Sequence, residues 1–106
     1  MRVLIAIALT LLLPQIAAAE DWRYCLAPSH AERKIYISMP FAATMSMDAA
    51  ESQFGRVLTR SGLRYDDVQC PQSDSESSAL AMQRHAIGIN HELGIQVIDT
   101  RWKPGS

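Results

Sequence analysis

The pair of cysteines is the feature that most restricts the fold of this 106-residue chain. Cys25 and Cys70 are its only cysteines, and they lie far apart in the sequence. A bond between them closes a loop of roughly 45 residues, which the chain-entropy model values at about 4 kcal/mol of stabilisation. A small domain has only about 5–10 kcal/mol of stability in total. Neither cysteine belongs to a redox-type CxxC motif, so we predict a structural disulfide.

Residues 1–19 have the pattern of a cleaved secretory signal peptide. Arg2 supplies a positive start, residues 3–13 form an almost uninterrupted apolar run, Pro14 breaks it, and residues 17–19 are all alanine. The apolar run is shorter than the roughly 20 residues that cross a bilayer. We therefore expect cleavage after position 19, export to the periplasm or the cell exterior, and no membrane span in the mature chain. Such compartments favour disulfide formation.

The mature chain, residues 20–106, is expected to form a single small domain without internal repeats. The whole sequence has 11 acidic residues against 10 lysines and arginines, and its densest basic pair is Arg33-Lys34. A nucleic acid or an anionic membrane would need a basic stripe to neutralise its phosphates. The charge pattern therefore favours neither partner.

Alternation of side chains predicts four short strands. They are residues 22–27, 33–39, 63–68 and 95–102. In the second of these, Ile35, Ile37 and Met39 face one way and Tyr36 faces the other. The third is the weakest, because the pair Asp66-Asp67 disfavours a strand.

Two further segments have helical periodicity, with a residue at every third or fourth position forming one stripe. The first stripe is Met47, Ala50, Phe54, Val57 and Ser61. The second is Ala79, Met82, Ala86, Ile89 and Leu93. Ser46 or Asp48 can cap the first helix, and Ser73 with Glu76 has the spacing of a capping box before the second.

The predicted order is ββαβαβ, which indicates an α+β fold. Because each helix has one apolar stripe, we expect both to cover the same face of a four-stranded mixed sheet in a two-layer sandwich. The covered face would carry Ile35, Ile37 and Met39, and Tyr36 would lie on the open face. Cys25 in the first strand would be tied to Cys70 after the third.

Glycines inside both predicted helices leave two interpretations open. Gly55 and Gly88 each cost about 1 kcal/mol relative to alanine in a helix interior. They mark either close backbone packing, of one helix against the other or of a helix against a partner, or tolerated change on a solvent-facing surface.

No catalytic, metal or cofactor motif stands out. His85 and His91 lie in the second predicted helix but six positions apart, so their rings point in different directions and cannot share one ion. His85 and Glu92 share a face but lie about 10 Å apart along the axis. We predict no cofactor and no metal, and these side chains are interpreted as solvated.

Aromatic side chains are the best candidates for a binding surface, because rings with a polar tip favour interfaces. Tyr36 is predicted to lie on the open sheet face with some of the other rings. The full set of candidates is Tyr36, Trp22, Tyr24, Tyr65 and Trp102.

The sequence therefore predicts a non-enzymatic exported binding module that acts on a protein or an envelope component, such as an inhibitor, an immunity-type protein or an accessory subunit. The alternative is a small hydrolase-type enzyme that uses His85, His91 or Glu92 with a carboxylate from the sheet. A homo-oligomer whose sheet face is a self-interface is the third alternative.

Overall fold

The computed structural model describes residues 21–105. The predicted signal peptide lies outside the described residues. None of the described helices is long and apolar enough to cross a membrane.

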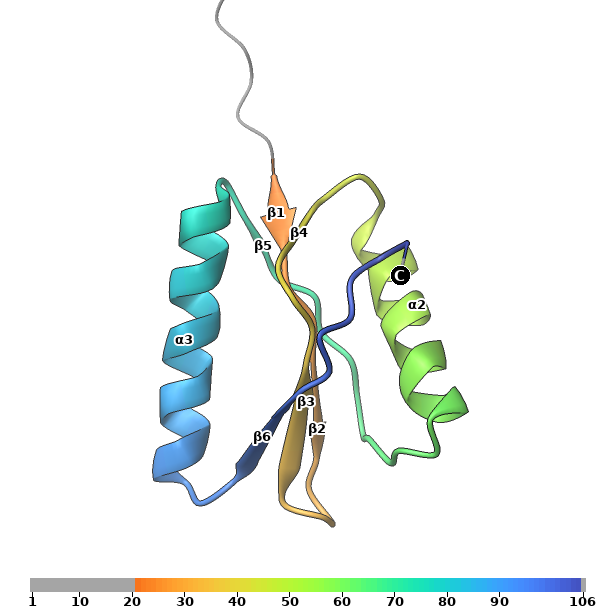
Figure 1. The fold of residues 1–106 in the computed structure, drawn as a ribbon, viewed down its shortest axis with the longest axis vertical. Helices are drawn as coiled ribbons and strands as arrows, with labels where there is room; N and C mark the ends of the chain where they lie inside the picture. The colour runs from red at the N-terminus through yellow and green to blue at the C-terminus, as the bar shows by residue number, and fades with distance from the viewer. Residues whose placement is uncertain (1–20, 106) are drawn as a thin grey trace, which may run out of the picture.

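Two helices and six short strands build the described part of the chain (Figure 1). In chain order they are β1 (Trp22–Arg23), β2 (Leu26–Ser29), β3 (Lys34–Ile37), β4 (Phe41–Ala42), α2 (Met47–Arg60), β5 (Gln72–Ser73), α3 (Glu76–Glu92) and β6 (Gln96–Asp99). One three-stranded sheet has the order β2-β3-β6, with β2 antiparallel and β6 parallel to β3. The other has the order β4-β1-β5 and is antiparallel. The predicted α+β class is confirmed.

The prediction of one four-stranded sheet is wrong. The predicted first strand is interrupted, so that its two halves, β1 and β2, belong to different sheets. The predicted strand at residues 63–68 does not form, and an isolated bridge joins Gln69 to Leu26 instead. Asp66 explains part of this difference, because its backbone N–H donates to Pro28 O (2.8 Å) and its side chain is bound to the turn after β2.

The two helices lie on opposite sides of the strands (Figure 1), so the prediction that both cover one face is wrong. Both faces of β3 are apolar, and each is covered. Tyr36 belongs to the core cluster beside α2 and is 1% exposed. Ile35 and Ile37 alternate with it, face the side of α3 and are also buried. The result is three layers, with the strands in the middle.

The main core lies between the strands and α2. Phe54 and Leu58 of α2 are fully buried there, and the ring of Trp102 lies 5.3 Å from that of Phe54 and 6.1 Å from that of Phe41, measured between centroids. Of the two predicted cap candidates, Ser46 and Asp48, Ser46 is the N-cap: its Oγ accepts from Ala49 N (3.1 Å). The cluster comprises Cys25, Ala27, Tyr36, Phe41, Ala50, Phe54, Leu58, Cys70 and Trp102.

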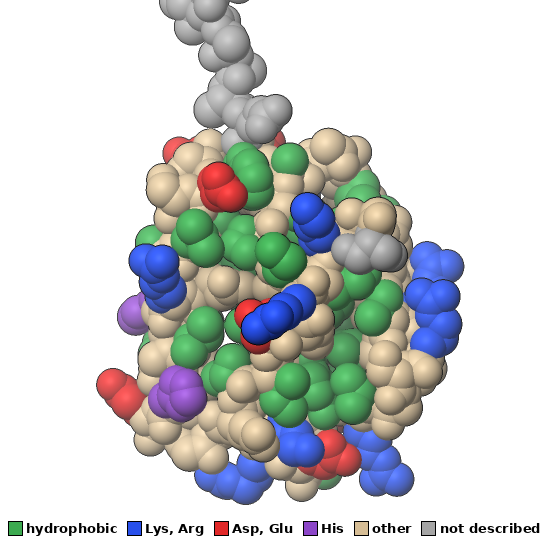
Figure 2. Space-filling model, in the orientation of Figure 1, with side chains coloured by type: hydrophobic (Ala, Val, Ile, Leu, Met, Phe, Trp, Pro, Cys, Tyr) green, Lys and Arg blue, Asp and Glu red, His purple; other side chains and the backbone are tan. Residues whose placement is uncertain are grey.

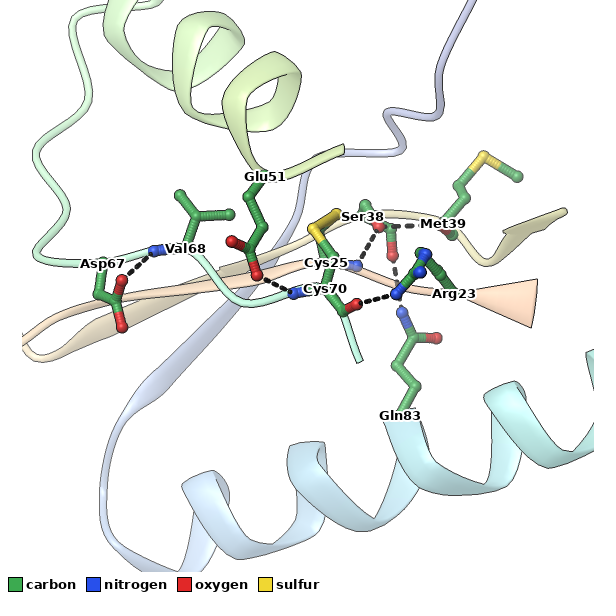
Figure 3. Close-up of a disulfide and its surroundings, with 9 residues drawn as sticks. All are labelled: Arg23, Cys25, Ser38, Met39, Glu51, Asp67, Val68, Cys70 and Gln83. Carbon is green, nitrogen blue, oxygen red and sulfur yellow. Dashed lines mark hydrogen bonds between the residues drawn. A yellow bond between two sulfur atoms is a disulfide. The ribbon is translucent and has the colours of Figure 1, made fainter. Parts of the chain in front are cut away.

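The predicted disulfide is confirmed: Cys25 and Cys70 are bonded and both are buried (Figure 3). The backbone N–H and C=O groups of Cys70 are both hydrogen-bonded to charged side chains. Glu51 Oε2 accepts from Cys70 N (3.2 Å), and Arg23 Nη1 donates to Cys70 O (3.0 Å). Arg23 is buried as well, and its Nη2 donates to Gln72 Oε1 (2.9 Å). The bond indicates an oxidising setting.

Helix α3 buries a narrow face. Its buried residues are Ala79 and Gln83, and Gln83 Nε2 donates to Ser38 O (2.7 Å), an interaction visible in Figure 3. The N-cap is Ser75, whose Oγ accepts from Ser78 N (3.1 Å). The predicted capping box, which placed the cap two residues earlier, is therefore wrong.

The stripe predicted to be the buried face of α3 is mostly exposed. Met82, Ile89 and Leu93 are 37%, 43% and 61% exposed. Gln83 explains the error: this polar side chain points inward because a backbone carbonyl accepts its hydrogen bond. Compared with the prediction, α3 is rotated about its own axis, so the apolar stripe lies beside the face that packs on the strands.

Candidate binding site at the end of helix α3

The predicted aromatic binding surface does not exist as a surface. Tyr36, Tyr24 and Trp102 are buried, with exposed fractions of 1%, 4% and 9%, and Trp22 and Tyr65 are half-buried. Tyr36 lies in the core beside α2, where burial raises the pKa of its hydroxyl and the nearby Glu32 carboxylate raises it further. The proposed open face is the one that α2 covers.

Tyr65 instead has a packing role against α2. Its hydroxyl donates to Gly55 O (3.1 Å) and lies 3.2 Å from Thr59 Oγ1. A Cβ on Gly55 would lie 2.9 Å from that hydroxyl, whereas a Cβ on Gly88 would meet nothing within 4 Å. Open surface, one of the two interpretations of these glycines, holds for Gly88. Gly55 is closely approached, but by the side chain of Tyr65 and not by the other helix or by backbone.

The residues of the hydrolase alternative are not brought together. His85, His91 and Glu92 are all exposed on α3, and within residues 21–105 none of their side chains has a hydrogen bond or ion pair. Over the same residues, no group of three or more histidines, cysteines or carboxylates could hold a metal ion.

A different histidine and carboxylate do meet, at the turn between β2 and β3. Asp66 Oδ2 accepts from the backbone N–H of His30 (2.8 Å) and also contacts ring Nδ1 of His30. These two interactions, the backbone one first, lower the pKa of Asp66. The side chain of His30 is 80% exposed, so the carboxylate orients the ring at the surface. Within the described chain, no hydroxyl or thiol is hydrogen-bonded to this ring that it could activate as a nucleophile.

The pair His30–Asp66 could not be found from the sequence. The two residues are 36 positions apart, and neither belongs to a motif. Only the course of the chain, which runs Asp66 along the edge of β2, brings them together.

A cavity of about 300 Å³ lies between this turn and the end of α3. We call it the turn cavity. Pro28, Leu93 and Ile95 provide apolar walls, the pair Arg33-Lys34 provides cationic groups, and the imidazole of His30 lies beside them. No aspartate or glutamate belongs to the lining. The complete lining is Pro28, Ser29, His30, Arg33, Lys34, Asn90, Leu93 and Ile95.

Arg33 is held over the end of α3. Its Nη2 donates to Leu93 O (3.1 Å), one of the carbonyls that a helix C-terminus leaves without an intrahelical partner. Its backbone has a φ of 53°, in the left-handed region, which turns the chain from β2 into β3. Gly94 leaves room for this contact, because a Cβ there would lie 3.2 Å from Nη2 and the guanidinium would have to shift slightly. Arg33, one of the two cationic residues of the turn cavity, is thus held by the end of α3.

An exposed apolar stripe on α3 leads into the turn cavity. Met82, Ala86, Ile89 and Leu93 follow one another at steps of four, three and four residues, so they line one side of the helix. Leu93, the most exposed of them at 61%, also lines the cavity. We call these four residues the α3 stripe. Because Leu93 and Pro28 line the same cavity, the stripe reaches the turn cavity on the side of β2.

Comparisons with protein-family models, with curated proteins and with solved structures find no match to this chain. The α3 stripe and the turn cavity are therefore interpreted from their own geometry. Apolar groups in a row beside cationic groups can bind a surface that is apolar and carries an acidic group.

Proposed function

We propose that the mature chain is a non-enzymatic, exported binding module whose partner is another protein in the periplasm or outside the cell. The α3 stripe is the single observation that carries this proposal. Three large apolar side chains, Met82, Ile89 and Leu93, stay exposed along α3. In α2, by contrast, Phe54 and Leu58 are fully buried and Met47, at the first position, is its one exposed large apolar residue. Inhibitors, immunity-type proteins and accessory subunits are the functional classes to which such a module belongs.

The charges at the turn cavity define the partner further. Arg33 and Lys34 line it, and the lining contains no acidic residue; His30, which also lines it, is bound to Asp66 outside the lining. A partner that places an acidic side chain here and apolar side chains along the α3 stripe complements the site in both respects. Each aliphatic side chain that becomes fully buried contributes about 1.5–3 kcal/mol.

Capture from an envelope extract with the oxidised mature domain tests this function. The variant L93D places a charge in the α3 stripe, and M47D is its matched control. Met47 is 46% exposed, like the stripe residues, but lies at the start of α2 on the other side of the molecule. We expect one partner protein to be retained by the wild type and by M47D, and to be depleted about tenfold or more with L93D, the scale of a residue central to an interface.

Two results contradict the proposal. One is equal recovery of the same partner with L93D and with the wild type, which places the interface elsewhere. The other is the absence of any protein enriched by the wild type over a blank resin. A circular-dichroism melt of L93D accompanies the experiment and confirms that the variant is folded.

A further inference from the structure

The two edge strands of the sheet β2-β3-β6 differ in whether the backbone groups on their outer side are hydrogen-bonded. The outer edge of β2 is paired: Leu26 N donates to Gln69 O (2.8 Å), Gln69 N donates to Leu26 O (2.9 Å), and Asp66 N donates to Pro28 O (2.8 Å). The outer edge of β6 has no such cover, because β3 is its only neighbour among the described strands. In Figure 1, β6 passes in front of β3 with no other element over it.

The register of β6 fixes which of its backbone groups are unpaired. Gln96 N donates to Arg33 O (3.0 Å) and Thr100 N donates to Ile37 O (2.9 Å), so the even-numbered residues of β6 bond to β3. In a parallel pair the intervening residues point their N–H and C=O groups the other way. Val97 and Asp99 therefore present two donors and two acceptors at the outer edge.

The unpaired edge ends sharply after these two residues. Asp99 Oδ1 accepts from Arg101 N (2.8 Å), and Arg101 has a φ of 56° that turns the chain out of the extended conformation. The unpaired edge is thus short and has a fixed length. Unpaired edges are templates for another strand, and proteins usually cover them, as this chain does on the side of β2.

We propose that the outer edge of β6 pairs antiparallel with β6 of a second copy of this chain, which joins two sheets into one of six strands. The inference goes beyond the proposed function, because it involves β6 and leaves the α3 stripe out of the pairing. A second copy fits because one register satisfies the edge completely. With Val97 opposite Asp99 of the second copy, and the reverse, all four outward groups of each strand are hydrogen-bonded.

The side chains agree with the same register. Ile98 then lies opposite Ile98 of the second copy, at the non-hydrogen-bonded position where side chains approach most closely. Gln96 lies opposite Thr100, and the charged Asp99 lies opposite the neutral Val97, so like charges are not directly opposite each other and the two Asp99 side chains are diagonal neighbours. Hydrophobic side chains form several patches on the face between the two helices, with charged side chains among them (Figure 2).

A proline at position 97 tests the pairing selectively. V97P removes an N–H that points outward and makes no bond to β3, whereas V97A keeps that N–H and serves as the matched control. Sedimentation equilibrium of the oxidised mature chain measures the association. We expect a monomer–dimer equilibrium for the wild type and V97A, and a dissociation constant at least about tenfold higher for V97P.

Amide hydrogen exchange of the wild type gives a second readout that needs no variant. As the protein concentration rises, the amides of Val97 and Asp99 should become protected, whereas those of Gln96 and Ile98 should be protected at every concentration. A wild-type chain that stays monomeric up to about 1 mM overturns the proposal, and so does a dimer in which the two outward amides still exchange freely. If V97P does not fold, the exchange experiment decides alone.

Discussion

The two helices of this molecule cover opposite sides of the strands in different ways. Helix α2 closes a dense core: Phe54 and Leu58 are 0% and 1% exposed, and the disulfide lies beneath them in the same cluster. Helix α3 buries only Ala79 and Gln83, and it leaves large apolar side chains on its flank. The comparison indicates that the side of α2 contributes most of the buried core, whereas the side of α3 leaves apolar side chains exposed, which is the surface of the proposed interface.

The largest expected effect of this difference is on stability. Phe54→Ala should lower the free energy of unfolding by about 3–5 kcal/mol, because it removes a fully buried ring and leaves a cavity. Leu93→Ala should change it by no more than about 0.5 kcal/mol, because Leu93 is already exposed. Urea denaturation of the oxidised domain measures both. Similar losses for the two variants would mean that α3 is as tightly packed as α2.

Alanine substitutions at the two helix glycines should change stability by less, and to different extents. Gly55→Ala and Gly88→Ala gain the same helix propensity, about 1 kcal/mol. Only the first must displace the Tyr65 hydroxyl and disturb its bond to Gly55 O. We expect G88A to be about 1–2 kcal/mol more stable to denaturant than G55A.

The background Y65F is the control for the glycine pair. Without the hydroxyl, the added methyl group of G55A has room, so the difference between the two alanine variants should shrink in a double-mutant cycle. A difference of the same size in Y65F would assign the effect to something other than this contact.

The smallest expected effect concerns pH and the pair His30–Asp66. The pKa of Asp66 is lower in the folded state than in the unfolded chain, so its interaction stabilises the fold above the unfolded value of about 3.9 and is lost as the pH falls through the folded value. Between pH 6 and pH 2 the wild type should therefore lose more stability than Asp66→Asn. Denaturation midpoints across this range measure it, and parallel curves for the two proteins would contradict the assignment.

The features that the sequence predicted correctly are those with a local or unique signal. The disulfide could be predicted because only one pairing of two cysteines exists. The helix beginning after Ser46 could be predicted because its cap and its period both lie within a few neighbouring residues. Such signals do not depend on how distant parts of the chain meet.

The features that were predicted wrongly depend on distant contacts. Alternation separates Tyr36 from Ile35 and Ile37, but it does not reveal that both sets are covered, one by each helix. The inward face of α3 was misplaced because Gln83, a polar residue, finds its acceptor 45 positions away at Ser38 O. The open edge of β6 and the turn cavity also follow only from the tertiary arrangement.

The burial of the disulfide has a consequence for how the protein must be made. Thiol–disulfide exchange requires a thiolate to reach one of the two sulfur atoms, and Cys25 and Cys70 are 0% and 1% exposed. An oxidase can therefore act only before α2 closes over the cysteines, and a reductant can act only after that side of the molecule opens. The order of events during maturation, oxidation first and closure second, is thus imposed by the packing. Once closed, the domain resists reducing surroundings for as long as α2 stays in place.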